Sequence, residues 1–215
     1  MSKLSQLAYD RFKEALWDGR LAPGAAVSQG ELIALLGVSL ASLREAMQVL
    51  EAEGLLQVHP RSGIRITKPD LGLVKDLFQF RMILEQAGLR RFAEDCSTAE
   101  LAALERVHMA LYDDVAAITD DATRLHRSVE LDYLFHGRLI AALNNQIVTG
   151  HYRRNRDRLR LGRIAPQVRG SVFMVRLTIQ EHLKVIGALK VGDRDAAAKR
   201  LDEHLQTALH RAIGM

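Results

Sequence analysis

Cysteine, proline and aromatic residues are all scarce in this chain of 215 residues. Cys96 is the only cysteine, which excludes an internal disulfide and fits a reducing compartment. Only four prolines and 5% aromatic residues favour a helical protein over a sheet protein. No stretch approaches the roughly 18 consecutive apolar residues of a membrane span, and the N-terminus lacks the apolar core of a signal peptide. We therefore expect a cytoplasmic protein with no membrane partner.

Apolar residues make up 48% of the chain, which is enough to bury a sizeable core. A length of 215 residues allows one large or two modest domains. The net charge of +4 is too small to identify an anionic partner by itself, so the placement of the basic residues carries more information.

The stretch from Ser28 to Gly54 predicts two helices joined by a tight turn. Ser28 and Glu31 have the spacing of a capping box, so a first helix starts near Gln29. Gly37 can end that helix in a left-handed conformation, and Ser39 can cap a second helix that Gly54 ends. This is helix-turn-helix geometry, in which the second helix enters the major groove of DNA.

The second helix of this pair is amphipathic. Its apolar stripe has helical spacing and consists of Leu43, Ala46, Met47 and Leu50. Its other face carries Ser42, Arg44, Gln48 and Glu51. Two short strand patterns follow at residues 55–59 and 64–67, joined by the turn residues 59–63. Residues 1–69 therefore predict a winged helix-turn-helix domain.

Five short motifs in this region resemble the DNA-binding domain of the GntR transcription regulators. They are GRLAPG, VSQGEL, LGVS, LREAMQVLEAEGLL and PRSGIRI. The chain departs from the family where Gly30 replaces a usual arginine and where Leu40-Ala41-Ser42 replaces Arg-Thr-Pro. The resemblance implies binding to double-stranded DNA through the helix starts, the second helix and the wing. The expected contact residues are Ser28, Gln29, Ser39, Ala41, Ser42, Arg44, Arg61, Ser62 and Gly63.

Strand signals vanish after Asp70, and six helical patterns with short breaks follow. They cover residues 71–95, 98–118, 121–143, 145–164, 170–191 and 193–213. We therefore predict a mainly α protein in which residues 70–215 form an antiparallel six-helix bundle.

Polar residues interrupt the apolar stripes of three of these helices. Asp132 and His136 lie one turn apart on one stripe, and His182 and His204 each lie on another. Three imidazoles and a carboxylate suit zinc, nickel, manganese or iron. The alternative is that each is a hydrogen-bonded core residue. His108 lies on a similar inward-facing stripe, but we assign it no metal and place it outside the set of four.

A second resemblance bears on these residues. The stretches LDYLFHGRLI and TIQEHLKVIGALKVGDRDAAAKRLDEHL, with RMILEQAGLRRFA before them, look like the FCD effector domain of the FadR branch. The resemblance implies a metal at Asp132, His136, His182 and His204, completed by a small carboxylate effector. Arg81, in the opening helix, and Arg156, near an inner face, are candidate effector contacts. The alternative for the arginine-rich stretch 151–163 is a solvated helix face.

The whole pattern predicts a transcription regulator rather than an enzyme. We expect a homodimeric repressor that binds a near-palindromic operator and releases it when a small organic acid binds at the metal. Two alternatives remain open. Three histidines and a carboxylate could serve a metal-dependent helical enzyme. Gly30 and Leu40 could instead mark a degenerate relative that has lost DNA binding.

Overall fold

The computed structural model describes residues 1–60, 63–163 and 171–214. The chain forms two compact units. One holds Met1–Leu73 together with helix α7 from Arg154 onward, and the other holds Val74–Arg153 and the C-terminal helices. The N-terminal unit therefore includes half of a helix that the sequence places in the bundle.

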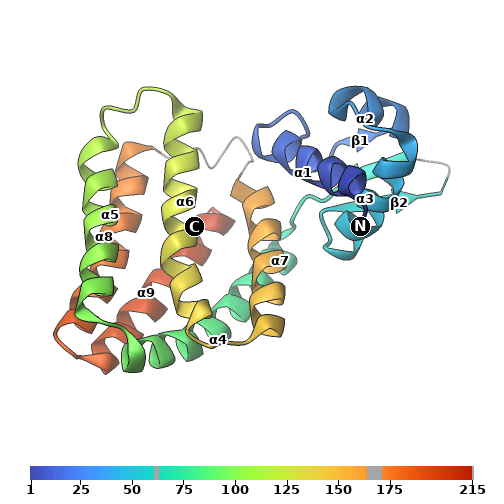
Figure 1. The fold of residues 1–215 in the computed structure, drawn as a ribbon. Coiled ribbons are helices and arrows are strands. Elements are labelled where there is room, and N and C mark those ends of the chain that lie inside the picture. The colour runs from blue at the N-terminus through green and yellow to red at the C-terminus, as the bar shows by residue number, and fades with distance from the viewer. Residues whose placement is uncertain (61–62, 164–170, 215) are drawn as a thin grey trace. The chain divides into compact units, whose positions relative to one another are not determined.

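The N-terminal unit contains three helices and three short strands in its described residues (Figure 1). In chain order they are α1 (Lys3–Trp17), β1 (Ala26–Val27), α2 (Gln29–Leu36), α3 (Leu40–Ala52), β2 (Leu56–His59) and β3 (Gly63–Ile66).

Side-chain caps set the ends of α2 and α3 where the sequence predicts them. The Ser28 hydroxyl accepts from the Glu31 backbone N–H, and the Glu31 carboxylate accepts from the Ser28 N–H, which completes the capping box. Gly37 ends α2 with a φ of 60°, a left-handed conformation that glycine adopts without strain. Ser39 caps α3 by accepting from the Ser42 N–H. The helix-turn-helix geometry follows from these caps.

The wing is part of a three-stranded antiparallel sheet in the order β1-β3-β2. Ile64 of β3 faces Val58 of β2 on one side and Val27 of β1 on the other. The sequence pattern predicts β2 and β3 but not β1, because two residues are too few to show alternation. The predicted contact residues Arg61 and Ser62 lie outside the described residues.

The core of this unit gathers around α1 and α3. Phe12, Leu16, Leu43 and Leu50 are fully buried, and Leu161 of α7 belongs to the same cluster. Helix α1 starts at Lys3 and turns Ser5 inward, so that Leu4 is 65% exposed.

Six helices follow Asp70 in the described residues, as the sequence predicts (Figure 1). They are α4 (Leu71–Asp95), α5 (Thr98–Asp114), α6 (Asp121–Ala141), α7 (Gln146–Arg163), α8 (Val172–Lys190) and α9 (Arg194–Ile213). The start of α4 and α7 from Arg154 onward belong to the N-terminal unit, and the rest forms the helical unit. Helix α8 packs against both α5 and α9, and α5 also packs against α6. The predicted end at Ile164 and the predicted start at Gly170 lie outside the described residues.

Among the described residues no single helix is long and apolar enough to cross a membrane. The bent pair α2 and α3, which meet at 104°, passes that test only when the two helices are taken together, on length and composition.

Gly88 brings α4 and α6 unusually close together. A Cβ atom at Gly88 would lie 2.4 Å from the backbone oxygen of Leu139. Only glycine fits such an approach, because a backbone atom cannot move aside as the end of a side chain can. One turn back along each helix, this contact places Glu85 of α4 beside His136 of α6, and so builds one wall of the candidate site.

Candidate functional site

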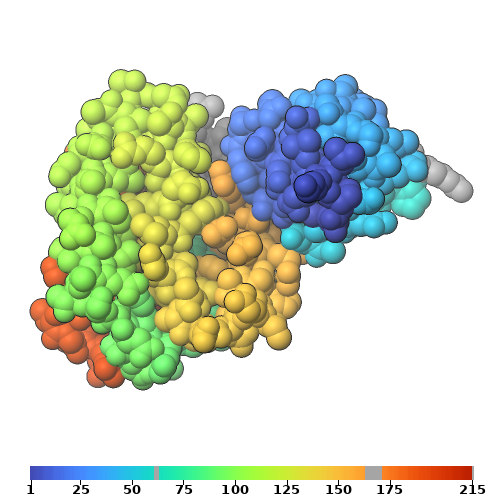
Figure 2. All heavy atoms as spheres, in the orientation of Figure 1, coloured from blue at the N-terminus to red at the C-terminus, as the bar shows by residue number. Residues whose placement is uncertain are grey.

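Four buried polar residues converge inside the helical unit. Asp132 and His136 come from α6, His182 from α8 and His204 from α9. One ligand atom from each lies within 4.8 Å of every other. Helices α5 and α6 cover the face of the unit seen in Figure 2, and the four residues are at most 7% exposed. The structure therefore brings together the four residues that the helical periodicity selected.

The Nε2 atoms of the three histidines face one another. His204 Nε2 lies 3.3 Å from His136 Nε2 and 3.3 Å from His182 Nε2. The Asp132 carboxylate lies 3.5 Å from His136 Nε2. The cluster thus presents nitrogen and oxygen atoms to one point.

Two of the histidines are held from behind by carboxylates. His136 donates from Nδ1 to Glu85 at 2.6 Å, and His204 donates from Nδ1 to Glu181 at 2.8 Å. A carboxylate can only accept here, so the proton of each neutral ring is on Nδ1 and the lone pair is on Nε2. When both rings are neutral, the Nε2 lone pairs of His136 and His204 therefore face each other across 3.3 Å.

His182 is held by another histidine. Its Nδ1 lies 3.1 Å from Nε2 of His108, whose own Nδ1 lies 2.7 Å from the Leu104 carbonyl oxygen. Helix α5 packs the stripe that carries His108 directly against α8. His108 is no member of the four, but it touches one of them.

Glu85 accepts three hydrogen bonds from other residues of the site. Besides His136, its oxygens accept from Arg81 Nε at 2.7 Å and from the Tyr152 hydroxyl at 2.5 Å. Burial alone would raise the pKa of Glu85, but the charges of Arg81 and His136 lower it to about 2. Arg81 is 4% exposed, and its Nη2 atom has no hydrogen-bond partner among the described residues. A buried donor of this kind calls for an acceptor.

Burial and neighbouring charges shift the pKa values of the three imidazoles in different directions. Burial would lower the pKa of His136, but the Glu85 carboxylate raises it above the usual value. Burial, reinforced by the His204 and His136 rings, holds the pKa of His182 well below the usual value. Burial also lowers the pKa of His204, although the bond to Glu181 opposes it. His182 and His204 are therefore neutral near pH 7, as ligation requires.

The sequence pattern missed the residues that hold the imidazoles. Glu85 was included only as part of the stretch RMILEQAGLRRFA that resembles the FCD domain. Glu181, His108 and Tyr152 were given no role. A signal existed for Glu85 and His108, because both are polar residues on otherwise apolar stripes. Glu181 gave none, since it serves a histidine on the next helix.

Arg156 does not belong to the unit that contains the four converging residues. It belongs to the portion of α7 that forms part of the N-terminal unit, where its Nε lies 3.9 Å from Asp157. Its role toward an effector stays a prediction.

The predicted DNA contacts differ in their accessibility. Ala41 and Arg44 are exposed on α3, and the capping residues Ser28 and Ser39 are exposed at the helix starts. Ser42 is only 8% exposed, and its hydroxyl lies 2.9 Å from that of Ser39. Its side chain completes the start of α3 and faces away from solvent. The half-buried residues of the set are Gln29 and Gly63.

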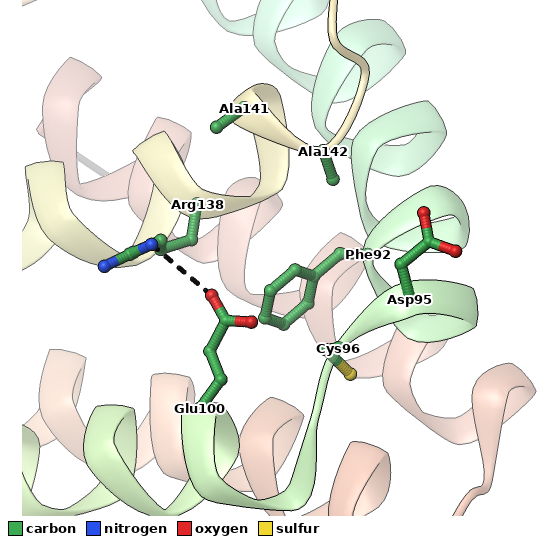
Figure 3. A pocket seen from close by; sticks show the side chains of 7 residues that line it. All are labelled: Phe92, Asp95, Cys96, Glu100, Arg138, Ala141 and Ala142. Atoms are coloured by element: carbon green, nitrogen blue, oxygen red, sulfur yellow. Dashed lines mark hydrogen bonds and ion pairs between the residues drawn. The ribbon is translucent and has the colours of Figure 1, made fainter.

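A separate hollow of about 170 Å³ lies at the ends of α4 and α6 (Figure 3). Phe92 and Cys96 line it with an Arg138–Glu100 ion pair of 3.4 Å. Burial raises the pKa of the Cys96 thiol, which disfavours the reactive thiolate. None of the four converging residues lines this hollow.

Two families of known proteins match the chain. Residues 4–66 match the bacterial regulatory proteins of the gntR family, and residues 76–207 match the FCD domain. The two matches cover the N-terminal helix-turn-helix with its wing and nearly all of the helical bundle.

Individual relatives are distant but extend over most of the chain. The uncharacterized regulator YdhC of Bacillus subtilis is 24% identical over 91% of this chain and 85% of its own length. The transcriptional repressor NanR of Klebsiella aerogenes is 25% identical over 99% of this chain and 87% of its own. The Nta operon regulator of Aminobacter aminovorans is 29% identical over 86% and 82%.

Solved structures share the fold. Escherichia coli McbR/YncC superposes with a TM-score of 0.80 at 20% identity and covers 100% of this chain and 99% of its own. A GntR transcriptional regulator from Rhodococcus sp. RHA1 gives the same TM-score at 21% identity, over 99% of each chain.

Proposed function

The chain belongs to the gntR family of bacterial regulatory proteins and carries an FCD domain, and from this membership we propose a metal- and effector-controlled repressor. That the chain is a transcriptional regulator rather than an enzyme follows from the families it matches. The repressor role, the metal, the effector, the homodimer and the cytoplasmic location are the proposed part.

The observation that supports the metal is the pair of imidazole Nε2 atoms 3.3 Å apart, with a carboxylate bonded to the Nδ1 atom of each ring. Facing lone pairs repel each other, and a cation between them removes the repulsion. Two ligands of a tetrahedral ion with metal–nitrogen distances of about 2.0–2.1 Å lie about 3.3 Å apart. The donor set of His136, His182, His204 and Asp132 therefore fits a divalent ion.

Zinc, nickel, manganese and iron all accept imidazole and carboxylate ligands. When bound, the ion would supply a Lewis-acidic position for an anionic ligand. Asp132 would contribute the one negative charge of the ligand set, while Glu85 and Glu181 hold two of the rings from behind.

Arg81 supports a small organic acid as the effector. Its unbonded Nη2 atom is a buried cationic donor, and the charge of Asp132 acts on the same guanidinium. A carboxylate bound to the metal would give that donor an acceptor. Arg156 remains a second proposed contact on the strength of the sequence alone.

The N-terminal unit would read DNA through α3 and the wing. Arg44 and Ala41 are exposed on α3, Gly63 begins β3, and Arg61 and Ser62 are proposed contacts from the sequence alone. A homodimer would place two such units on a near-palindromic operator. Repression is supported by relatives such as NanR, which is named as a repressor.

The test is operator binding by the full chain with and without zinc and organic acids. Duplexes from the chain's own upstream region are titrated by fluorescence anisotropy against a scrambled duplex. We expect specific binding that zinc with an effective acid weakens at least several-fold. Specific binding that no metal or acid changes would leave a regulator without the proposed control. No specific binding at all would favour a relative that has lost its operator.

A further inference from the structure

We propose that His108 is a positioning residue that fixes the tautomer of His182 so that its lone pair is on Nε2. The purpose of this positioning role rests on the proposed metal function. The hydrogen bonds that define the role do not depend on a metal.

The argument starts at the Leu104 carbonyl. Its oxygen lies 2.7 Å from Nδ1 of His108, one helical turn further along α5. A carbonyl oxygen only accepts hydrogen bonds, so Nδ1 of His108 carries a proton. A neutral imidazole has one N–H, and Nε2 of His108 is therefore an acceptor.

The proton position on His108 in turn determines which nitrogen of His182 on α8 carries a proton. Nε2 of His108 lies 3.1 Å from Nδ1 of His182. Because the first atom accepts, the second must donate, so the proton of His182 is on Nδ1. Its lone pair is then on Nε2, the atom that lies 3.3 Å from His204 Nε2.

The surroundings hold both rings in this arrangement. Phe135 stacks on His182 with ring centroids 4.2 Å apart and an angle of 16°, and its edge contact with His108 spans 5.8 Å at 82°. His108 is 0% and His182 is 1% exposed, so solvent offers no competing acceptor. The ring planes and the proton position are fixed together.

Because His108 is neutral, the residue that bonds His182 adds no negative charge to the site. Glu85 is offset by Arg81 and Glu181 by Arg211, and Asp132 supplies the one carboxylate of the four converging residues. With a histidine behind His182, a divalent ion keeps a net positive charge toward an acidic effector. A third carboxylate at this position would cancel that charge.

The experiment reads the tautomer directly. Metal-free full-length protein labelled with ¹⁵N is measured by long-range ¹H–¹⁵N correlation, which separates Nδ1–H from Nε2–H rings. We expect His182 as the Nδ1–H form in the wild type and a mixture in His108→Leu, which has no acceptor. His108→Gln keeps an acceptor oxygen and should retain more of the Nδ1–H form.

Zinc titrations of the same proteins give the second readout. His108→Leu should bind zinc about 10–100-fold more weakly, the usual effect of losing a residue that orients a ligand. His108→Gln should lose less, and His210→Leu, an exposed histidine on α9, should bind as the wild type does.

An Nε2–H His182 in the wild type would overturn the proposal, whether or not any variant folds. So would a His108→Leu protein with an unchanged tautomer and unchanged zinc affinity. A wild type that binds no zinc but shows the expected tautomers would refute the metal function and support the positioning role.

Discussion

Arg44 is the one arginine of helix α3, and it lies on the exposed face of this amphipathic helix. The family arginines are absent at Gly30 and Leu40, so Arg44 has to supply the strongest base or phosphate contact of this helix. Arg44→Ala should weaken operator binding by about 1–3 kcal/mol, the value of one good bidentate base contact.

The measurement is fluorescence anisotropy on the operator, with thermal melting to check the fold. Arg91→Ala, which removes an exposed arginine from α4 in the helical unit, serves as the control and should bind normally. Operator binding by Arg44→Ala that matches the wild type would remove α3 from the proposed interface.

Helix α4 depends on a single glycine for its contact with α6. In Gly88→Ala the new Cβ would lie 2.4 Å from the Leu139 oxygen, so the helices must separate. We expect a loss of about 1–3 kcal/mol in the free energy of unfolding, as overpacked cores show. The same shift lengthens the Glu85–His136 bond and should weaken zinc binding.

Gly187→Ala on α8 is the matched control. A Cβ there meets nothing within 4 Å, and an alanine inside a helix is favoured over glycine by about 0.5–1 kcal/mol. Gly187→Ala should therefore melt at or above the wild-type temperature. Equal melting of both variants and the wild type would mean that α4 and α6 tolerate separation.

The sequence predicted the helices well because their ends are marked by local chemistry. Ser28, Ser39 and Ser97 each cap a helix through their own side chain, and Gly37 ends one. Strand β1 was missed because its two residues pair with β3 only after the chain has folded back. The assignment of α7 from Arg154 onward to the N-terminal unit is likewise a matter of packing.

The candidate site, like the fold, could be predicted only in part from the sequence. Asp132, His136, His182 and His204 could be selected by periodicity, since each interrupts an apolar stripe. The residues that bond the imidazole rings could not be predicted, because which carboxylate reaches which ring depends on how two helices pack. Glu181 adjoins His182 in the chain but bonds His204 on α9.

The titrating groups make the stability of the whole molecule depend on pH. The pKa of His182 and of His204 is depressed in the folded state, so their contribution is present above about pH 6.5 and lost as the pH falls. The raised pKa of His136 has the opposite sign and offsets part of this. Arg211, against burial, lowers the pKa of Glu181 to about 2, so its contribution is lost as the pH falls from about 4.5 to about 2.

Metal-free protein should therefore melt at lower temperature on acidification, in two steps. Thermal unfolding between pH 8 and pH 3 in the presence of chelator measures both. Glu181→Gln should reduce the second step but not abolish it, because Glu85 also has a pKa of about 2. A melting temperature that stays level or rises from pH 7 to pH 5 would contradict the assigned shifts.

Metal binding should stabilise the whole chain, because the four ligands from three helices meet only when it is folded. An ion present at about 100 times its Kd adds about 2.7 kcal/mol. For a chain of this size that shift raises the melting temperature by about 5–10 °C. Chelator should remove it, and so should His182→Ala or His204→Ala. His210→Ala, which removes an exposed histidine from the same helix as His204, should keep it. A melting temperature that does not change with chelator, zinc or nickel would leave the four residues as hydrogen-bonded core polar groups without the proposed metal.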